Sequence, residues 1–267
     1  MVRIGIAGAA GKMGSRITAL SKEYDGLQLT GAFERKGHRD LGKDIGILAG
    51  IGELGLALSE RIEEIIDNVD MIVDFTSVDS TKENLWTAAA RGKAMVIGTT
   101  GFTKEDINEI RPLTDKIPCV MASNMSLGVN LLLKVLADVA RILGDDYDVE
   151  IVEAHHRLKK DAPSGTALKM AQIIADAVNR NLDEVAVYSR KGIIGQRTRK
   201  EIGIQTVRAG DIVGEHTVLF GGLGERIEIT HKASSRDTFA RGAFKAALWL
   251  ADKPAGLYDM QDVLGLK

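Results

Sequence analysis

The sequence predicts an α/β protein in two parts: a parallel sheet with helices on both faces, then an α+β part with a mixed or antiparallel sheet. Three observations support this prediction. Up to residue 124, short apolar runs alternate with segments of helical periodicity, which is typical of a parallel sheet covered on both faces. Beyond it, strand-like runs are separated by turn residues, as in antiparallel sheets. The 267 residues are also enough for two modest hydrophobic cores.

Five buried strands and three helices are expected in the first part. The strands are residues 2–7, 27–33, 71–75, 94–97 and 119–122. The first helix follows a glycine-rich turn, because Met13, Ile17 and Leu20 recur at helical spacing. The other two helices cover residues 80–91 and 104–111. The glycine-rich and charged residues 37–55 have no clear period, so a loop is expected there.

The second part begins with a long helix over residues 127–143. An extended segment at 148–156 and a helix over 164–179 follow, then strands at 203–208, 211–220 and 225–232. A final helix at 238–250 could return to cover the first part. We therefore predict a dinucleotide-binding domain of residues 1–125, completed by 236–267, and a substrate-binding domain of residues 126–235.

Composition excludes several classes of protein. Hydrophobic residues make up 45% of the chain and charged residues 27%, which is ordinary for a globular protein. The net charge of −2 gives no basic surface for nucleic acid, and no apolar run reaches the length of a membrane span. The single cysteine, Cys119, excludes an intrachain disulfide framework and fits a reducing compartment. A cytoplasmic location and a small-molecule partner are expected.

A glycine-rich turn at residues 8–14 predicts a Rossmann-like nucleotide site. It follows a strand, opens a helix and has the spacing G-x-x-G-x-x-G, one residue looser than the common form. Glycine lets the backbone approach a pyrophosphate, which the N–H groups of the helix start then bind. The expected contacts are Gly8, Ala9, Ala10, Gly11, Lys12 and Met13.

Glu34 stands at the end of the second strand, about twenty residues after the glycines, where an acid hydrogen-bonds the ribose 2′-hydroxyl. Arg35 and Lys36 follow, and cations there suit the 2′-phosphate of NADP, so both NADH and NADPH are expected. Two later strand ends lie on the edge of the sheet where ligands bind. These loops contribute Gly98, Thr99 and Thr100, and Ala122, Ser123, Asn124 and Met125. The alternative is a solvated strand end and ordinary turns.

Residues 153–167 combine two histidines and three cations with a Pro-Ser-Gly-Thr element that is typical of a helix start. Alternation along a strand would place Glu153 and His155 on one face and His156 on the other, unless the strand ends there. An imidazole can supply a proton near neutral pH. Lys159 and the free N–H groups of a helix start favour an anion. Together they indicate an anionic substrate that must be protonated, although a capped surface helix behind basic residues is the alternative.

This element resembles the signature of the dihydrodipicolinate reductases of the bacterial lysine and diaminopimelate pathway, roughly E-x-H-H-x-x-K-x-D-A-P-S-G-T-A. The resemblance covers essentially the whole chain. It includes residues 8–14, 98–102, 124–130 and 228–236. It implies reduction of a cyclic imine that carries two carboxylates, with a hydride from NADH or NADPH.

The resemblance also implies roles for individual residues. His155 would be the general acid and Lys159 a second proton donor or charge stabiliser. The substrate carboxylates would be held by His156, Gly165 and Thr166. Members of the family are homotetramers in which the second domain also serves oligomerisation. Leu158 stands where some members have another histidine, and a leucine side chain has no proton to transfer.

Two other readings remain open. One is a different two-domain NAD(P)-dependent dehydrogenase, such as an aspartate-semialdehyde or homoserine dehydrogenase. The first of these needs a cysteine nucleophile, and Cys119 lies within an apolar strand. The other is a non-catalytic dinucleotide sensor, which has no need of His155 and Lys159 together. No ligand cluster for a metal is seen in the sequence.

Overall fold

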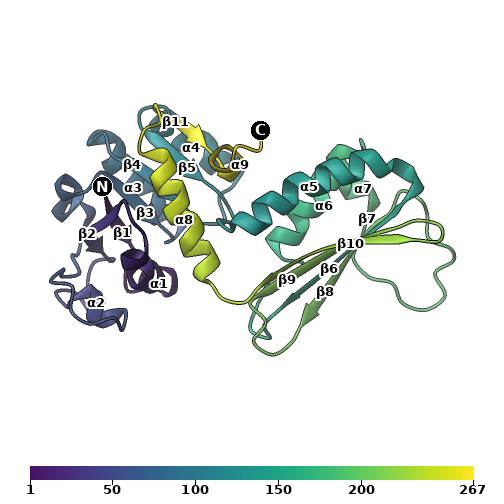
Figure 1. The fold of residues 1–267 in the computed structure, drawn as a ribbon, viewed down its shortest axis with the longest axis horizontal. Coiled ribbons are helices and arrows are strands. Elements are labelled where there is room, and N and C mark those ends of the chain that lie inside the picture. Colours follow the sequence, from purple (N-terminus) through teal and green to yellow (C-terminus); the bar gives the residue numbers. More distant parts are fainter. The chain divides into compact units, whose positions relative to one another are not determined.

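The computed structural model describes residues 1–267, and the chain forms two compact units. The first contains Met1–Leu127 and Arg236–Lys267, and the second contains Gly128–Ser235. Figure 1 shows the C-terminal helix α8 (Asp237–Leu250) lying with the strands of the first unit, although it follows the second in sequence. No helix of the structure combines the length and the hydropathy that crossing a membrane requires.

The first unit is built on a parallel sheet in the order β11-β5-β4-β3-β1-β2. Its strands are β1 (Val2–Ala7), β2 (Leu27–Phe33), β3 (Met71–Asp74), β4 (Ala94–Ile97), β5 (Pro118–Met121) and β11 (Gly256–Tyr258). All residues of β3 and β4 are buried, as expected for central strands between two helical layers. The predicted parallel sheet is confirmed, and β11 extends it by one short edge strand that the sequence had not indicated.

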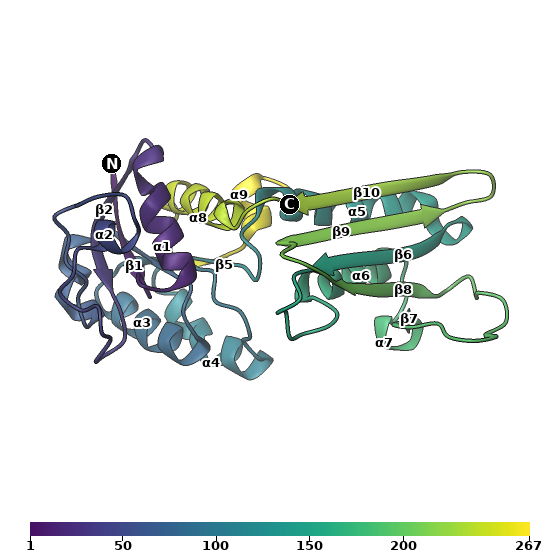
Figure 2. The same ribbon diagram turned by 90° about the horizontal axis from the view of Figure 1, so that it is seen from below.

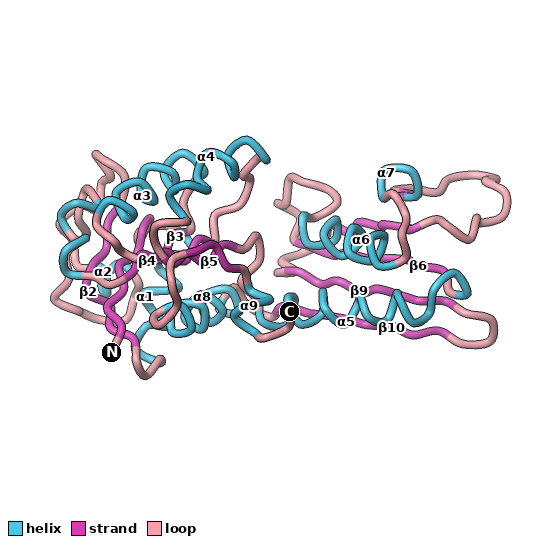
Figure 3. Tube along the Cα trace, turned by 90° about the horizontal axis from the view of Figure 1, so that it is seen from above, coloured by secondary structure: helices cyan, strands magenta, loops and turns pink.

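Helices cover both faces of this sheet. They are α1 (Lys12–Leu20), α2 (Ile45–Leu48), α3 (Val78–Ala90), α4 (Lys104–Thr114), α8 and α9 (Met260–Leu264), with 3₁₀ turns at Ser21–Glu23, Ile62–Glu64 and Ile66–Asn68. Figure 3 shows α3 and α4 on one face and α1 and α8 on the other. Side chains alternate accordingly: Val73 and Val96 pack in the core under α1 and α8, whereas Ile72, Met95 and Cys119 pack under α3 and α4.

The prediction of a continuous loop over residues 37–55 was wrong in part. The short helix α2 lies within it, and the Asp44 side chain caps this helix by accepting hydrogen bonds from the N–H groups of Gly46 and Ile47. The same carboxylate also accepts from the N–H groups of Leu54 and Leu56. The Asp44 carboxylate therefore joins the start of α2 to residues 54–56 through hydrogen bonds, in a segment that has no hydrophobic period.

The second unit contains a mixed sheet in the order β10-β9-β6-β8-β7. Its strands are β6 (Asp148–His155), β7 (Ala186–Val187), β8 (Ile202–Arg208), β9 (Gly214–Gly221) and β10 (Arg226–Ala233). Its helices are α5 (Leu127–Leu143), α6 (Gly165–Ala177) and α7 (Leu182–Val185), and a 3₁₀ turn covers Gly144–Asp146. Strand β6 runs parallel to β8 and antiparallel to β9, so the predicted mixed sheet is confirmed. In Figure 2, β10, β9, β6 and β8 lie side by side in front of α5 and α6.

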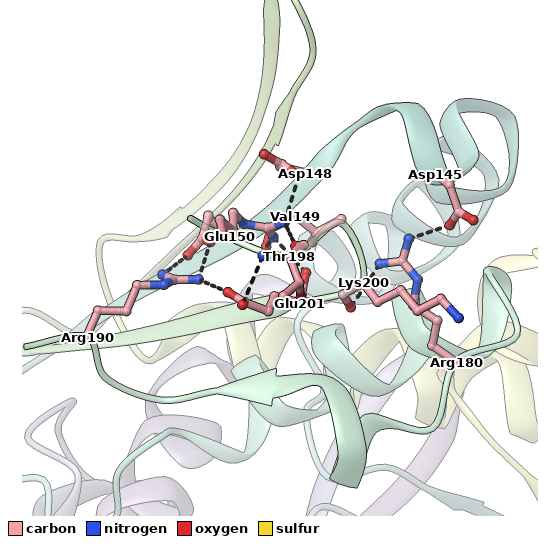
Figure 4. Close-up of polar contacts among 10 residues, drawn as sticks. Asp145, Asp148, Val149, Glu150, Arg180, Arg190, Thr198, Lys200 and Glu201 are labelled. Carbon is pink, nitrogen blue, oxygen red and sulfur yellow. Dashed lines mark hydrogen bonds and ion pairs between the residues drawn. The ribbon is translucent and has the colours of Figure 1, made fainter. Parts of the chain in front are cut away.

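An arginine network holds the loop between β7 and β8 against the start of β6 (Figure 4). Glu150 accepts from Arg190 at 2.7 Å and from Arg197 at 3.1 Å, and Arg190 also donates to Glu201 at 3.1 Å. The Glu150 carboxylate lies over Gly203 of β8, where a Cβ would come within 1.8 Å of its oxygen. Glycine at 203 is therefore required by the side chain that crosses above it.

Candidate active site

The glycine-rich turn has the backbone geometry of an anion-binding helix start. Gly8 has a φ of +66°, which favours glycine, and Gly11 is the N-cap of α1 with no side chain bonded to the helix start. A Cβ at Gly14 would lie 2.2 Å from the Gly8 carbonyl oxygen, so α1 can pack this closely only with glycine there. The first N–H groups of α1 are thus left for a ligand.

A cavity of about 530 Å³ joins this turn to the end of β2. Its lining brings together the predicted Gly8, Gly11, Glu34, Arg35 and Lys36. The lining also includes four charged residues that sequence reasoning did not single out, namely Glu60, Arg61, Glu63 and Glu83. Acids and bases therefore face the same space, where the sequence predicts the ribose 2′ position.

A buried carboxylate at the end of β3 links two neighbouring loops. Asp74 is fully buried and accepts from the N–H and hydroxyl of Thr76 at 2.9 and 2.6 Å. It also accepts from the Thr81 and Thr99 hydroxyls and from the Asn84 amide, at 3.2, 3.2 and 2.8 Å. Asp74 thereby fixes the loop after β3 to the loop after β4. The sequence analysis missed it, although a charged residue at the end of an apolar strand was the available signal.

The loops after β4 and β5 meet at a second cavity of about 430 Å³. Of the predicted cofactor residues, Thr99, Thr100, Ala122 and Ser123 line it, with Tyr258 and Lys267 from the C-terminal segment. The other three predicted residues of these loops, Gly98, Asn124 and Met125, do not line it. Met125 packs its side chain in the core, and the side-chain Oδ1 of Asn124 accepts from the Ser126 N–H at 2.9 Å.

In the second unit, strand β6 ends at His155, so His156 lies beyond the alternation of the strand. Glu153 and His155 share the buried face, as predicted for an extended segment. The Glu153 carboxylate is fully buried and lies 2.6 Å from His155 Nδ1. It also accepts two hydrogen bonds from Arg208 at 2.8 Å, one from the Thr206 hydroxyl at 3.1 Å and one from the Ser164 N–H at 3.0 Å.

These contacts control the charge states of both groups. Burial opposes ionisation of Glu153, but the hydrogen bonds from Arg208, His155 and Ser164 outweigh it and lower the pKa of this carboxyl to about 2. For His155, burial lowers the pKa, and the hydrogen bond to Glu153 opposes that effect. His155 is therefore held beside a permanent anion and gives up its proton readily.

A second histidine, His216 on β9, lies next to this pair. Its ring is 5.2 Å from that of His155, and its Nε2 is 3.0 Å from the Ser164 hydroxyl. Burial lowers the pKa of His216 to about 4, so it is neutral at physiological pH. Sequence reasoning missed both His216 and Arg208, because each reaches the site only through strand pairing.

The start of α6 lies against the same cluster. The Ser164 side chain caps the helix by accepting from the Ala167 N–H at 3.2 Å, and a Cβ at Gly165 would meet nothing within 4 Å. Gly165 thus leaves open space beside the first N–H groups of a helix of 13 residues. Thr166 is the next residue of that turn, so two of the three predicted carboxylate contacts are adjacent.

The remaining predicted residues lie in the turn after β6. Lys159 Nζ forms an ion pair with Asp161 at 2.9 Å, and His156 Nδ1 is buried without a hydrogen-bond partner. Leu158, at 80% exposure, faces solvent. Cys119 is fully buried, and burial raises the pKa of its thiol to about 12, which removes it as a nucleophile.

Comparison with known proteins covers the whole chain. The family model "Dihydrodipicolinate reductase, N-terminus" matches residues 2–125, and "Dihydrodipicolinate reductase, C-terminus" matches residues 128–264. The 4-hydroxy-tetrahydrodipicolinate reductases of Syntrophobacter fumaroxidans and Syntrophus aciditrophicus are 58% and 54% identical over 267 residues, 100% of both chains in each case.

Among solved structures, the dipicolinate-bound dihydrodipicolinate reductase from Paenisporosarcina sp. TG-14 superposes with a TM-score of 0.74. It is 25% identical, with 98% of each chain covered. Both family models and the full-length relatives agree with the resemblance of residues 153–167. This chain belongs to the dihydrodipicolinate reductase family, whose curated relatives are 4-hydroxy-tetrahydrodipicolinate reductases.

Proposed function

We propose that this chain reduces the cyclic imine dicarboxylate of the lysine and diaminopimelate pathway to tetrahydrodipicolinate, with His155 as the proton donor. The chain is an oxidoreductase that uses a nicotinamide dinucleotide, as its family membership indicates. The observation that carries the proposal is the cluster in the second unit. There a histidine bound to a buried carboxylate stands beside a lysine and a capped helix start.

On the cofactor side, the N–H groups at the start of α1 would hold the pyrophosphate, and Glu34 or Arg35 the ribose 2′ position. The loops after β4 and β5 would accept the nicotinamide ribose. Since acids and bases both line this cavity, we expect it to accept both NADH and NADPH. The bound cofactor supplies a hydride.

On the substrate side, hydride addition to a conjugated imine leaves negative charge that a proton must neutralise. His155 would supply that proton from Nε2, and Lys159 would stabilise the developing charge. One carboxylate would lie against the N–H groups of Gly165 and Thr166, and His156 would bind the other. Each step uses a residue of the second unit that has the required chemistry.

We further propose a cytoplasmic homotetramer assembled through the second unit. The support for the assembly is the sheet face opposite α5 and α6, on which Val152 and Val207 are exposed. The Rossmann-like unit would then be left to bind the cofactor.

Spectroscopic turnover tests the function. Purified protein with freshly generated substrate is expected to oxidise both NADH and NADPH, and pyridine-2,6-dicarboxylate is expected to compete with the substrate. Pyridine-2-carboxylate should bind at least about tenfold more weakly, because one charge-assisted hydrogen-bonded carboxylate is lost. Equal inhibition constants would rule out a site for two carboxylates. Cofactor binding without turnover would favour a sensor, and turnover of another substrate a different dehydrogenase.

A further inference from the structure

We propose that Glu153 and Arg208 are positioning residues that orient the His155 ring and fix its tautomer. Neither residue is among those that the family signature assigns to proton transfer or substrate binding. The kinetic part of the proposal rests on the proposed role of His155 as the proton donor. The tautomer of the imidazole is a property of the protein alone and can be measured without substrate.

The strand register explains why these groups meet. In the pairing of β6 with β8, Glu153 lies opposite Thr206, and His155 lies opposite Arg208. All four side chains point to the same face, because each strand alternates with a period of two. Arg208 then donates one hydrogen bond to each oxygen of Glu153, both at 2.8 Å. Two parallel bonds of this kind hold the carboxylate in one plane.

The donors around Glu153 determine the tautomer. Ser164 N–H, Thr206 and Arg208 all donate to Oε1, and Arg208 donates to Oε2 as well. An ionised carboxylate can only accept, so His155 Nδ1, at 2.6 Å from Oε2, must carry a hydrogen. The neutral ring is therefore the Nδ1–H form, and Nε2 is the atom that gains or loses a proton. Nε2 lies over Gly214, where a Cβ would be 3.1 Å away.

Four charged or titratable groups act on the His155 ring, and a fifth pairs with one of them. Glu153 favours the imidazolium, whereas Lys159 and Arg208 disfavour it. His216 faces the ring from β9 and is itself neutral, and Asp161 pairs with Lys159. Arg208 thus has two effects. It holds the Glu153 carboxylate that orients His155, and its positive charge weakens the attraction of that carboxylate for the His155 proton. An acid with a proton affinity reduced in this way transfers its proton more easily.

The test uses two substitutions with opposite expected effects. In Glu153→Gln, the amide oxygen should take the place of Oε1, where three donors converge, so the NH₂ group faces Nδ1. The neutral ring must then switch to the Nε2–H form, and the pKa of His155 should fall by about one unit. In Arg208→Met, the carboxylate remains without its cation, so the pKa of His155 should rise by about one unit with the Nδ1–H form kept.

Both changes are read from the ¹⁵N shifts of labelled imidazoles as pH varies. The chain has five histidines, so His155→Asn identifies the signal of interest. Glu153→Gln should also lower kcat about 10²-fold or more. In this variant, release of the proton from His155 Nε2 would leave the His155 Nδ1–H facing the NH₂ group of the new amide side chain, and two donors cannot bond to each other. The KM for the substrate should change far less, since the oxygen that holds Ser164 is retained.

Glu150→Gln is the matched control. Glu150 lies on the same strand and binds Arg190 and Arg197, but the alternation of the strand turns its side chain to the face opposite Glu153. The Glu150→Gln substitution should leave the ¹⁵N signals of His155 unchanged. An unchanged tautomer in Glu153→Gln, or shifts of the same sign in the Glu153 and Arg208 variants, would overturn the proposal. If Glu153→Gln does not fold, the sign of the Arg208→Met shift decides alone. Absence of turnover in the unmodified enzyme would instead count against the proposed function and leave the tautomer test intact.

Discussion

At the scale of single residues, His155 and Lys159 have different local constraints. His155 is almost enclosed and anchored to Glu153, whereas Lys159 pairs with the exposed Asp161 in a turn. The lysine can therefore leave its partner for an anionic ligand at small cost, since exposed ion pairs contribute only about 0–1 kcal/mol. The histidine cannot move without disturbing a buried network.

Replacing either residue by alanine should lower turnover without weakening cofactor binding. We expect His155→Ala and Lys159→Ala each to reduce kcat by about 10²–10⁴, the usual contribution of a positioned acid. NADH affinity, measured by fluorescence titration, should stay nearly constant because both residues lie in the second unit. Lys160→Ala, next to Lys159 and exposed, is the control for lost charge. Near-normal turnover of the Lys159 variant at saturating substrate would contradict its role.

We expect the choice between NADH and NADPH to depend on the opposed charges of one cavity. Glu34 suits a 2′-hydroxyl, and Arg35 suits a 2′-phosphate, with Glu60 and Arg61 on the same wall. At an open strand end these effects are screened, so we expect less than about thirtyfold preference between NADH and NADPH. Comparing kcat/KM for both cofactors measures this preference.

The two substitutions should move that ratio in opposite directions. Arg35→Ala should favour NADH, and Glu34→Ala should favour NADPH. Arg39→Ala removes a nearby cation whose side chain is 90% exposed and does not line the cavity, so it should leave the ratio unchanged. A wild-type preference above about a thousandfold would mean that another loop recognises the 2′ position.

At the scale of elements, the C-terminal end of β3 joins two loops beside the proposed cofactor site. Asp74 fastens the loop after β3 to the loop after β4 through Thr76 and Thr99. Asp74→Asn replaces one acceptor oxygen by a donor and leaves a buried group unsatisfied, at a cost of about 1–3 kcal/mol. We expect the Kd for NADH to rise at least about fivefold. Asp70→Asn, at the other end of β3, loses a half-exposed pair with Arg3 and should leave binding unchanged.

Elements with a strong period could be predicted from the sequence, and those held by distant contacts could not. The long amphipathic helix α5 and the strands β2 and β4 have the predicted bounds, because buried apolar side chains recur along each of them. The C-terminal β11 and α9 have three and five residues, too few for a period to be recognised. Strand β9 begins at Gly214 and not at 211, because residues 210–213 form the turn that follows β8.

The same contrast holds for the site. Residues 153–167 are contiguous, so their chemistry is visible in the sequence. Arg208 lies 55 positions from Glu153 and His216 lies 52 from Ser164. Only the register of β6 with its two neighbours brings them together. Strand pairing between distant segments cannot be obtained from local periodicity.

At the scale of the whole molecule, the second unit leaves one face of its sheet without a helical layer. Val152 on β6 and Val207 on β8 point to that face and are 40% and 42% exposed. Apolar side chains on a broad sheet face favour association with another protein surface. This arrangement supports the proposed homotetramer, in which copies of the second unit would cover the face.

A charge placed on this face should therefore break the assembly. We expect the wild-type protein to have the mass of four chains of 28.8 kDa in light scattering, and Val152→Asp to have a lower mass because a buried unpaired charge is costly. Ile142→Asp is the matched control, since Ile142 is 80% exposed on α5, in the helical layer of the same unit. A wild-type monomer at micromolar concentration would exclude the tetramer. Equal dissociation of both variants would show that the helical layer, and not the open face of the sheet alone, takes part in the contact.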